Sequence, residues 1–350
     1  MRRVLLALVL CACQREGARP RGLPDVGPAL RAAIGDVDGD GRGEIAVADA
    51  GRLRLLDRSG RERASLPVPG AAQALLVADL DGDGRGEIAA GWGRDRAHPD
   101  ASARVSLYRL EGDALVEEVV AAPASERPEI AALLAEPPDL FVAWYDDRYL
   151  VKSAHARRAG DAWRLDEVAA LRTAGSYALG DVDGDGVRDL VVGRSYGDEV
   201  ASDGDAFLLR PDGARVAIPT TRGVHALAVI DGDLFLADGW DKDYGAVARA
   251  LLTRSRWTGV AFRSQVIDDV AGEHSIRSLL AADVDGDGVD ELVARASGSV
   301  RIYIRADGGW RGRRVAGAAA DLAAGNIDGA PGDELLVVGA GGSTWIGGGR

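Results

Sequence analysis

The chain has 350 residues, a net charge of −13 and an apolar content of 47%, with 47 glycines but only 4 phenylalanines. The acidic balance and the lack of a basic stripe exclude nucleic acid as a partner, because phosphates require clustered cations. Abundant glycine beside ordinary apolar content is typical of many short strands separated by turns.

The chain begins with an export signal rather than with part of the fold. Basic residues precede an apolar run, 4–12, which is too short to span a bilayer as a helix. The run ends in a Leu-Cys-Ala-Cys string at 10–13 that resembles a bacterial lipobox, with Cys13 as the residue that carries the lipid. A plain signal peptide with incidental cysteines is the alternative. The expected division is a lipoprotein-type signal peptide at 1–12, the lipidated cysteine and a tether at 13–24, and the folded domain at 25–350.

This leader has consequences for location and chemistry. We expect an exported, lipid-anchored bacterial envelope protein, periplasmic or on the cell surface, that touches the membrane only through its anchor. Both cysteines of the chain lie in the leader, so the fold contains no disulfide framework. We expect it to be monomeric.

A short acidic string then recurs along the chain. Four copies read Asp-x-Asp-Gly-Asp-Gly-x-x-acid, and they begin at Asp36, Asp79, Asp181 and Asp283. A fifth copy, from Asn326, is degenerate. An apolar stretch of strand character lies on each side of every intact copy, so each predicts a hairpin closed by an acidic loop.

The acidic loops have the donors of a calcium site. Carboxylates at positions 1, 3, 5 and 9 and the carbonyl at position 7 form an oxygen cage, with a sharp turn at the glycine of position 6. The expected ligands of about four structural Ca²⁺ sites are Asp36, Asp38, Asp40, Arg42 and Glu44; Asp79, Asp81, Asp83, Arg85 and Glu87; Asp181, Asp183, Asp185, Val187 and Asp189; and Asp283, Asp285, Asp287, Val289 and Glu291. Position 12 is apolar in every intact copy, which excludes an EF-hand.

The fifth loop keeps only part of this set. Asn326, Asp328 and Glu334 remain as weak ligands, whereas Ala330 removes a carboxylate. Pro331 occupies position 6, where its ring forbids the left-handed turn. We expect this site to be empty or weak.

Two long gaps between the acidic strings hold the same pair of apolar stretches around a tight turn, Pro137-Pro138 in one and Asp231-Gly232 in the other. Strands that follow the turns begin near Ile45, Ile88, Leu140, Leu190, Leu234, Leu292 and Leu335. Units of about 40 to 60 residues are the size of a propeller blade. The sequence therefore predicts an all-β, seven-bladed β-propeller. The last unit is one strand short, and we expect a segment near 19–28 to supply it.

The string ALGDVDGDGVRDLVVG, at 178–193, resembles the FG-GAP or VCBS repeat of integrin-alpha-type β-propellers. This resemblance implies that the calcium loops join the first and second strands of each blade on one face. There are departures, since no Phe-Gly pair precedes the loops and Gly193-Arg194-Ser195 stands where Gly-Ala-Pro is usual. Integrin-like partner specificity is therefore not implied.

Loops between the second and third strands then open on the opposite face, and in units 2 to 5 they are long, aromatic and charged. The ligand candidates are Trp92, Arg94, Trp144, Tyr145, Asp146, Arg194, Tyr196, Trp240, Asp241 and Tyr244. Flat rings beside charged groups suit a glycan or a protein surface. The alternative is that each ring packs over its own blade.

No nucleophile elbow, zinc-binding helix or phosphate loop is present in the sequence. The leading hypothesis is a calcium-stabilised binding module for a glycan or protein ligand at the cell envelope. Two alternatives stay open. One is a polysaccharide lyase or hydrolase built on a propeller, with a carboxylate pair such as Asp146 and Asp241. The other is a ligand-free scaffold.

Overall fold

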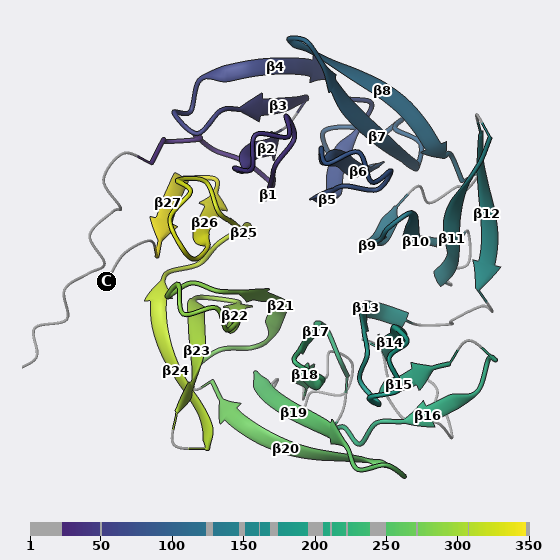
Figure 1. Cartoon of the computed structure of the whole chain (residues 1–350), viewed down its shortest axis with the longest axis vertical. Helices are drawn as coiled ribbons and strands as arrows, with labels where there is room; N and C mark the ends of the chain where they lie inside the picture. Colours follow the sequence, from purple (N-terminus) through teal and green to yellow (C-terminus); the bar gives the residue numbers. More distant parts are fainter. Residues whose placement is uncertain are drawn as a thin grey trace, which may run out of the picture.

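The computed structural model describes residues 23–49, 51–123, 129–146, 151–160, 162–168, 174–194, 206–210, 212–221, 223–238, 250–270, 272–306 and 308–347. These residues form seven antiparallel sheets arranged around a central opening (Figure 1). The all-β, seven-bladed propeller predicted from the sequence is thereby confirmed.

Each sheet is one blade, and its strands follow one another in chain order. Blades 1 to 4 contain β1 (Arg31–Gly35), β2 (Glu44–Ala48), β3 (Arg52–Leu56) and β4 (Glu62–Pro67); β5 (Ala71–Ala78), β6 (Glu87–Gly93), β7 (Arg104–Glu111) and β8 (Ala114–Ala121); β9 (Ile130–Glu136), β10 (Asp139–Tyr145), β11 (Val151–Ala159) and β12 (Ala162–Val168); and β13 (Ala174–Gly180), β14 (Asp189–Arg194), β15 (Ala206–Leu209) and β16 (Arg215–Ala217). Blades 5 to 7 contain β17 (Leu227–Ile230), β18 (Asp233–Asp238), β19 (Leu251–Trp257) and β20 (Phe262–Asp269); β21 (Ile276–Ala282), β22 (Glu291–Ala296), β23 (Val300–Ala306) and β24 (Gly309–Ala316); and β25 (Asp321–Gly325), β26 (Glu334–Gly339) and β27 (Gly342–Ile346).

The position of a strand in its blade explains its residue pattern. The first strand of each blade lies nearest the central opening and the fourth lies at the outside (Figure 1). Second strands such as β2 and β6 are buried along their whole length and read as continuous apolar runs. The outer strand β8 is mostly exposed or half-buried and carries charged residues.

The hydrophobic core lies between blades rather than at the centre of the ring. Among the described residues the buried apolar side chains form seven clusters, and each joins two neighbouring blades. Leu53 and Ile88, for example, join blades 1 and 2. Because no blade buries its faces alone, stability depends on the closure of the ring.

Blades 3 and 5, which lack an acidic loop, are confirmed as four-stranded sheets. The predicted tight turn at Asp231-Gly232 is also confirmed, since both residues have positive φ, 49° and 74°. This is the backbone of a type I′ hairpin turn, which matches the twist of the strands that it joins.

The prediction that a segment near 19–28 completes blade 7 as a strand was wrong for its described part. Blade 7 has three strands, and residues 23–30 form none. Instead Trp345 Nε1 donates a hydrogen bond to the Pro24 carbonyl at 2.7 Å, and the Val26 amide donates to Ser343 Oγ at 3.2 Å. Pro24 and Pro28 have no N–H, so this segment cannot donate a regular ladder. It closes the ring through side chains.

The expected signal peptide, with Cys13 and nearly all of the tether, lies outside the described residues. Within the described part of the chain, no helix is long and apolar enough to cross a membrane.

Candidate functional site

The four intact acidic loops join the first and second strands of blades 1, 2, 4 and 6. In blade 1 the Asp36 carboxylate folds the loop, because it accepts hydrogen bonds from the amides of Gly39, Asp40 and Gly41 at 2.7 to 3.0 Å. Gly39 and Gly41 have positive φ, 79° and 84°. The first aspartates of the other three loops accept the matching bonds at positions 4 and 6.

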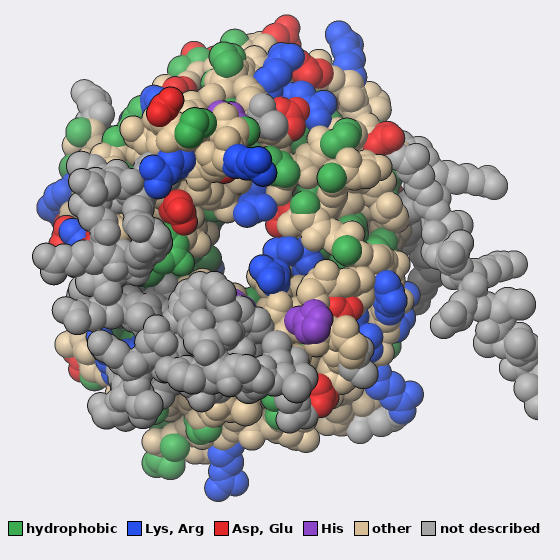
Figure 2. Space-filling model, turned by 180° about the vertical axis from the view of Figure 1, so that it is seen from behind, with side chains coloured by type: hydrophobic (Ala, Val, Ile, Leu, Met, Phe, Trp, Pro, Cys, Tyr) green, Lys and Arg blue, Asp and Glu red, His purple; other side chains and the backbone are tan. Residues whose placement is uncertain are grey.

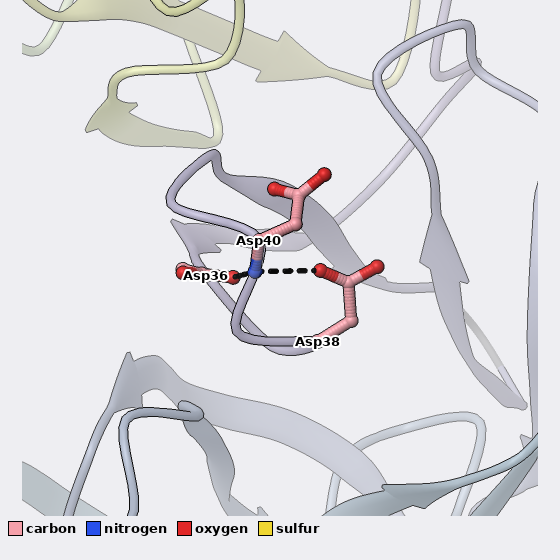
Figure 3. Close-up of side chains that lie close together, drawn as sticks. All are labelled: Asp36, Asp38 and Asp40. Atoms are coloured by element: carbon pink, nitrogen blue, oxygen red, sulfur yellow. Dashed lines mark hydrogen bonds between the residues drawn. The ribbon is translucent and has the colours of Figure 1, made fainter.

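This backbone brings carboxylates together. In blade 1, oxygen atoms of Asp36, Asp38 and Asp40 lie within 4.8 Å of one another (Figure 3). In the other three loops the cluster consists of positions 1, 3 and 9: Asp79, Asp81 and Glu87; Asp181, Asp183 and Asp189; and Asp283, Asp285 and Glu291. Three hard oxygen donors at this spacing fit Ca²⁺, which takes six to eight such ligands and tolerates irregular geometry.

Two predicted positions are arranged differently. The carboxylates of Asp83, Asp185 and Asp287 at position 5 are outside the clusters, and each accepts the amide of position 7 instead. Val187 and Val289 at position 7 expose their side chains, as expected for residues whose role is confined to the backbone. In blade 1, the Arg42 amide likewise donates to Asp40.

The acid at position 9 begins the second strand and is buried. Burial, with a contribution from the nearby Asp38 carboxylate, raises the pKa of Glu44 to about 7. Burial also raises the pKa of Glu291 to about 7. The Glu44 carboxylate accepts the amides of Val37 and Asp38, so it ties the loop to the strand. A cation at this point would favour the ionised form of both acids.

Arginines on or just after the third and fourth strands, which the sequence analysis did not identify, offset part of the loop charge. Arg63 on β4 pairs with Asp38, and Arg109 on β7 pairs with Asp81 at 3.4 Å and with Glu87 at 3.2 Å. In blade 4, Arg210 pairs with Asp183 at 2.7 Å. These contacts depend on which residue on or just after these strands reaches the loop, so no local pattern predicts them.

The two blades without an acidic loop keep the acid at the start of the second strand. Asp139 begins β10 and pairs with Arg157 at 2.7 Å, and Asp233 begins β18 and accepts a hydrogen bond from Arg254 at 2.8 Å. Here a guanidinium supplies the positive charge that a bound cation would supply in the acidic loops. The signal in the sequence is the Asp-Leu-Phe that opens both strands, which parallels Asp189-Leu-Val in blade 4.

The degenerate loop of blade 7 links its neighbours. The amide at position 8 of one loop donates to the carbonyl at position 1 of the loop before it. Asp333 donates to Asp283 at 2.6 Å, Gly43 to Asn326 at 2.7 Å, and Gly86 to Asp36 at 2.6 Å. The loops of blades 6, 7, 1 and 2 therefore form a continuous chain across the closure of the ring. The Asn326 carbonyl takes part in this row of hydrogen bonds whether or not a metal binds there.

Pro331 moves the sharp turn of this loop. The two positive φ angles fall at Gly329 and Gly332, positions 4 and 7, rather than at positions 4 and 6. Asp328 and Glu334 form no acidic cluster among the described residues. That the site is empty or weak stays a prediction.

The described candidates on the opposite face divide into two groups. Trp92 is fully buried, and its Nε1 donates to the hydroxyl of Tyr108 at 2.9 Å. Trp144 is 7% exposed. These two rings pack between the blades, so the proposal that they present a ligand surface is corrected. Arg94 is exposed, whereas Tyr145, Asp146 and Arg194 are half-buried. Tyr196, Trp240, Asp241 and Tyr244 lie outside the described residues.

Seven antiparallel blades, with acidic loops in the first hairpins of four of them, define a β-propeller with candidate metal loops. Residues 36–90, which include the first two loops, match the family described as FG-GAP-like repeat. The match and the seven blades together fit an FG-GAP β-propeller.

Solved structures show the same fold. Two crystal structures of BBS1N in complex with ARL6DN, one soaked with mercury and one with lead, are similar to the chain at TM-scores of 0.59 and 0.61. The first covers 94% of this chain and 94% of its own, the second 92% and 93%. Both are 14% identical in sequence, which supports the fold alone. No curated protein sequence matches the chain.

Proposed function

We propose that the protein is an exported, calcium-stabilised β-propeller that binds a glycan or protein ligand at the cell envelope. One observation carries the proposal: every acidic cluster among the described residues lies in a loop between a first and a second strand, at one end of the blades. Cations bound there would brace the hairpins and leave the other end of the ring free for a ligand.

The role proposed for calcium follows from charge. Each loop gathers carboxylates whose mutual repulsion opposes folding, and only some have an arginine partner. A divalent cation offsets that repulsion, and loops of this kind in extracellular proteins bind Ca²⁺ at about 0.1–1 mM. Each cluster draws its donors from one short loop that joins two strands, which favours a structural role over a catalytic one.

The proposed role as an interaction module has a parallel in the similar structures, in which BBS1N is in complex with ARL6DN. Propellers present one rigid face to a partner because the blades fix the positions of their loops. For this chain the proposed face is the one opposite the acidic loops, where Arg94, Tyr145 and Asp146 lie.

Capture of ligands by the purified full chain tests this function. The protein is immobilised and exposed to a glycan array and to solubilised envelope extract, once with calcium and once with excess chelator. We expect retention of a defined ligand that is lost when chelator is present. Reducing ends or unsaturated sugars that accumulate with time would instead indicate a hydrolase or lyase. If no ligand is retained, the proposal is overturned and the ligand-free scaffold is the remaining alternative.

Export and anchoring need a separate experiment. Cells that produce the wild-type chain, Cys13→Ser or Cys11→Ser are labelled with a fatty acid and fractionated. We expect the label and membrane association in wild type and in Cys11→Ser, and their loss in Cys13→Ser. Equal labelling of all three chains would contradict the proposed anchor.

A further inference from the structure

Three arginines gather at the central opening, at the end of the blades away from the acidic loops. Arg31 is the first residue of β1, Arg277 is the second residue of β21, and Arg295 is next to last in β22. Arg295 is paired with Ser278 across the two strands, so it lies at the same level as Arg277. Figure 2 shows this end of the molecule, with Lys and Arg side chains on the rim of the opening.

Neighbouring groups hold Arg31 and Arg295 in place without using most of their N–H donors. Arg31 Nε donates to the Gln73 carbonyl at 3.0 Å and its Nη1 to the Leu30 carbonyl at 2.8 Å. Arg295 Nε donates to Ser278 Oγ at 3.2 Å. A guanidinium has five N–H groups in a planar fork, so donors remain for a ligand.

The three arginines have too few neighbouring carboxylates to balance their positive charge. Asp321, the first residue of β25, is the carboxylate that interacts with Arg31 and Arg295. Burial raises the pKa of Asp321, and its Oδ2 accepts the Ala32 amide at 3.2 Å. Among the described residues no ion pair forms to Arg31, Arg277 or Arg295, although Arg63, Arg109, Arg157 and Arg210 all have carboxylate partners near the other end of the blades.

Repulsion within the cluster is evident at Arg295. Its pKa is lowered by burial first and then by the charges of Arg31 and Arg277, while Asp321 opposes the change. Like charges held together in a partly desolvated place favour an anion that offsets them. An oxyanion can accept paired N–H groups from more than one guanidinium.

We propose that Arg31, Arg277 and Arg295 form an oxyanion-binding site at the mouth of the central channel, which takes a carboxylate or phosphate group of the ligand. This deepens the proposed function, on which it rests for the choice of face, by naming the chemistry that the ligand carries. The site is assembled by blades 6 and 1, on either side of blade 7, so only the closed ring contains it.

Titration of the full chain with small anions tests the site without knowledge of the natural ligand. Citrate and inorganic phosphate are titrated separately by calorimetry at low ionic strength, with chloride at equal ionic strength as the reference. We expect Arg277→Gln and Arg31→Gln each to weaken binding by about tenfold or more. Stronger binding of citrate would indicate a carboxylate on the ligand, and stronger binding of phosphate a phosphate group.

Arg164→Gln is the matched control, because Arg164 is an exposed arginine on β12 of blade 3 and its substitution changes net charge equally. Its anion affinity should equal that of wild type. Arg277 is exposed, so its substitution should leave the melting temperature unchanged, and Arg277→Lys should retain part of the affinity. Absence of binding to wild type, an effect matched by chloride, or equal affinity of Arg277→Gln and wild type would overturn the site. These readouts need neither calcium nor an envelope ligand, so failure of the ligand-capture experiment would not be mistaken for failure of the site.

Discussion

At the scale of single residues, the inner strands of neighbouring blades approach closely where one strand has a glycine. A Cβ on Gly35, at the end of β1, would lie 2.5 Å from Val77 Cγ1 on β5 of the next blade. Gly325 has the same relation to Ile34, at 2.6 Å. The ends of inner strands thus pair a glycine with a β-branched residue, which lets the strands approach closely around the opening.

Gly35→Ala should destabilise the protein, because the new methyl group must displace a branched side chain in a packed interface. The expected loss is about 1–3 kcal/mol in the free energy of unfolding, measured by urea denaturation. Gly317→Ala is the control, since a Cβ there meets no atom within 4 Å. Equal stability of the two variants would contradict this account of blade packing.

His225, just before β17, should make stability depend on pH. Burial first, then the charge of Arg277, lowers its pKa to about 4, whereas the unfolded chain keeps the ordinary value near 6.5. Between these values the unfolded state binds the proton more readily, so acidification favours unfolding. From pH 7 to pH 5, wild type should lose about 1 kcal/mol more stability than His225→Gln, after allowance for the partial exposure of the ring. Parallel pH profiles for the two proteins would refute this role.

At the scale of the element, the acidic hairpin loop is a repeated unit with a replaceable charge partner. Four blades gather carboxylates that could hold a cation. In blades 3 and 5, which lack an acidic loop, Asp139 and Asp233 each have an arginine partner instead. The blade 7 loop has neither a complete cluster nor such a pair among the described residues, yet its backbone connects blades 6 and 1. The backbone link between neighbouring loops is therefore kept where the cluster of carboxylates is incomplete.

Chelation should lower the melting temperature, and added calcium should restore it. Each occupied site contributes about 2.7 kcal/mol when free calcium is a hundredfold above the dissociation constant. Asp285→Asn removes a ligand from the blade 6 cluster and should reduce the calcium-dependent rise, measured by scanning calorimetry. Asp328→Asn, at the same position of the degenerate loop, should leave it unchanged. A melting temperature that does not respond to chelator would contradict structural calcium.

At the scale of the whole molecule, no strand among the described residues is shared between the two ends of the chain where the ring closes. Val26 and Ala29 of the N-terminal segment pack in the cluster between blades 7 and 1, together with the buried Trp345. The contact of Gly43 with Asn326 closes the same junction at the acidic face. Closure thus combines apolar packing and a few hydrogen bonds, so a short segment has a large effect on a ring whose core lies entirely between blades.

Removal of this segment should destabilise the ring as a whole. A chain that begins at Ala29, and so lacks Val26 and the Pro24 carbonyl, should lose about 2–4 kcal/mol of unfolding free energy from lost burial and hydrogen bonding. A chain that begins at Leu23 retains every described contact and is the control. Trp345→Phe should cost about 1 kcal/mol, the value of one hydrogen bond. Urea denaturation of the two truncated chains and of Trp345→Phe measures these losses. Similar midpoints for the chains that begin at Ala29 and at Leu23 would show that the ring closes without the segment.

The blades and the acidic loops were predictable because their signals are local. Alternating or continuous apolar runs, turns such as Asp231-Gly232 and the glycines of the loops act within one hairpin. Burial of Trp92 and Trp144 was missed because the sequence analysis assigned both rings to the loops that follow the second strands. In the structure, β6 and β10 extend far enough to include them, and they are buried with the rest of those strands. The arginine partners of Asp139 and Asp233 were missed because they belong to other strands.

The sequence by itself determined the number of blades, the hairpins and the set of carboxylates in each loop, because each of these depends on residues less than one unit apart. Only the tertiary structure decided how blade 7 is completed, which aromatic rings are buried, and that Arg31 meets Arg277 and Arg295 at the central opening. Arg31 is separated from the other two by most of the chain, and the closure of the ring brings blade 1 near blade 6. Residues near the two ends of the chain become neighbours because the ring closes, and no local sequence pattern predicts which of them will meet.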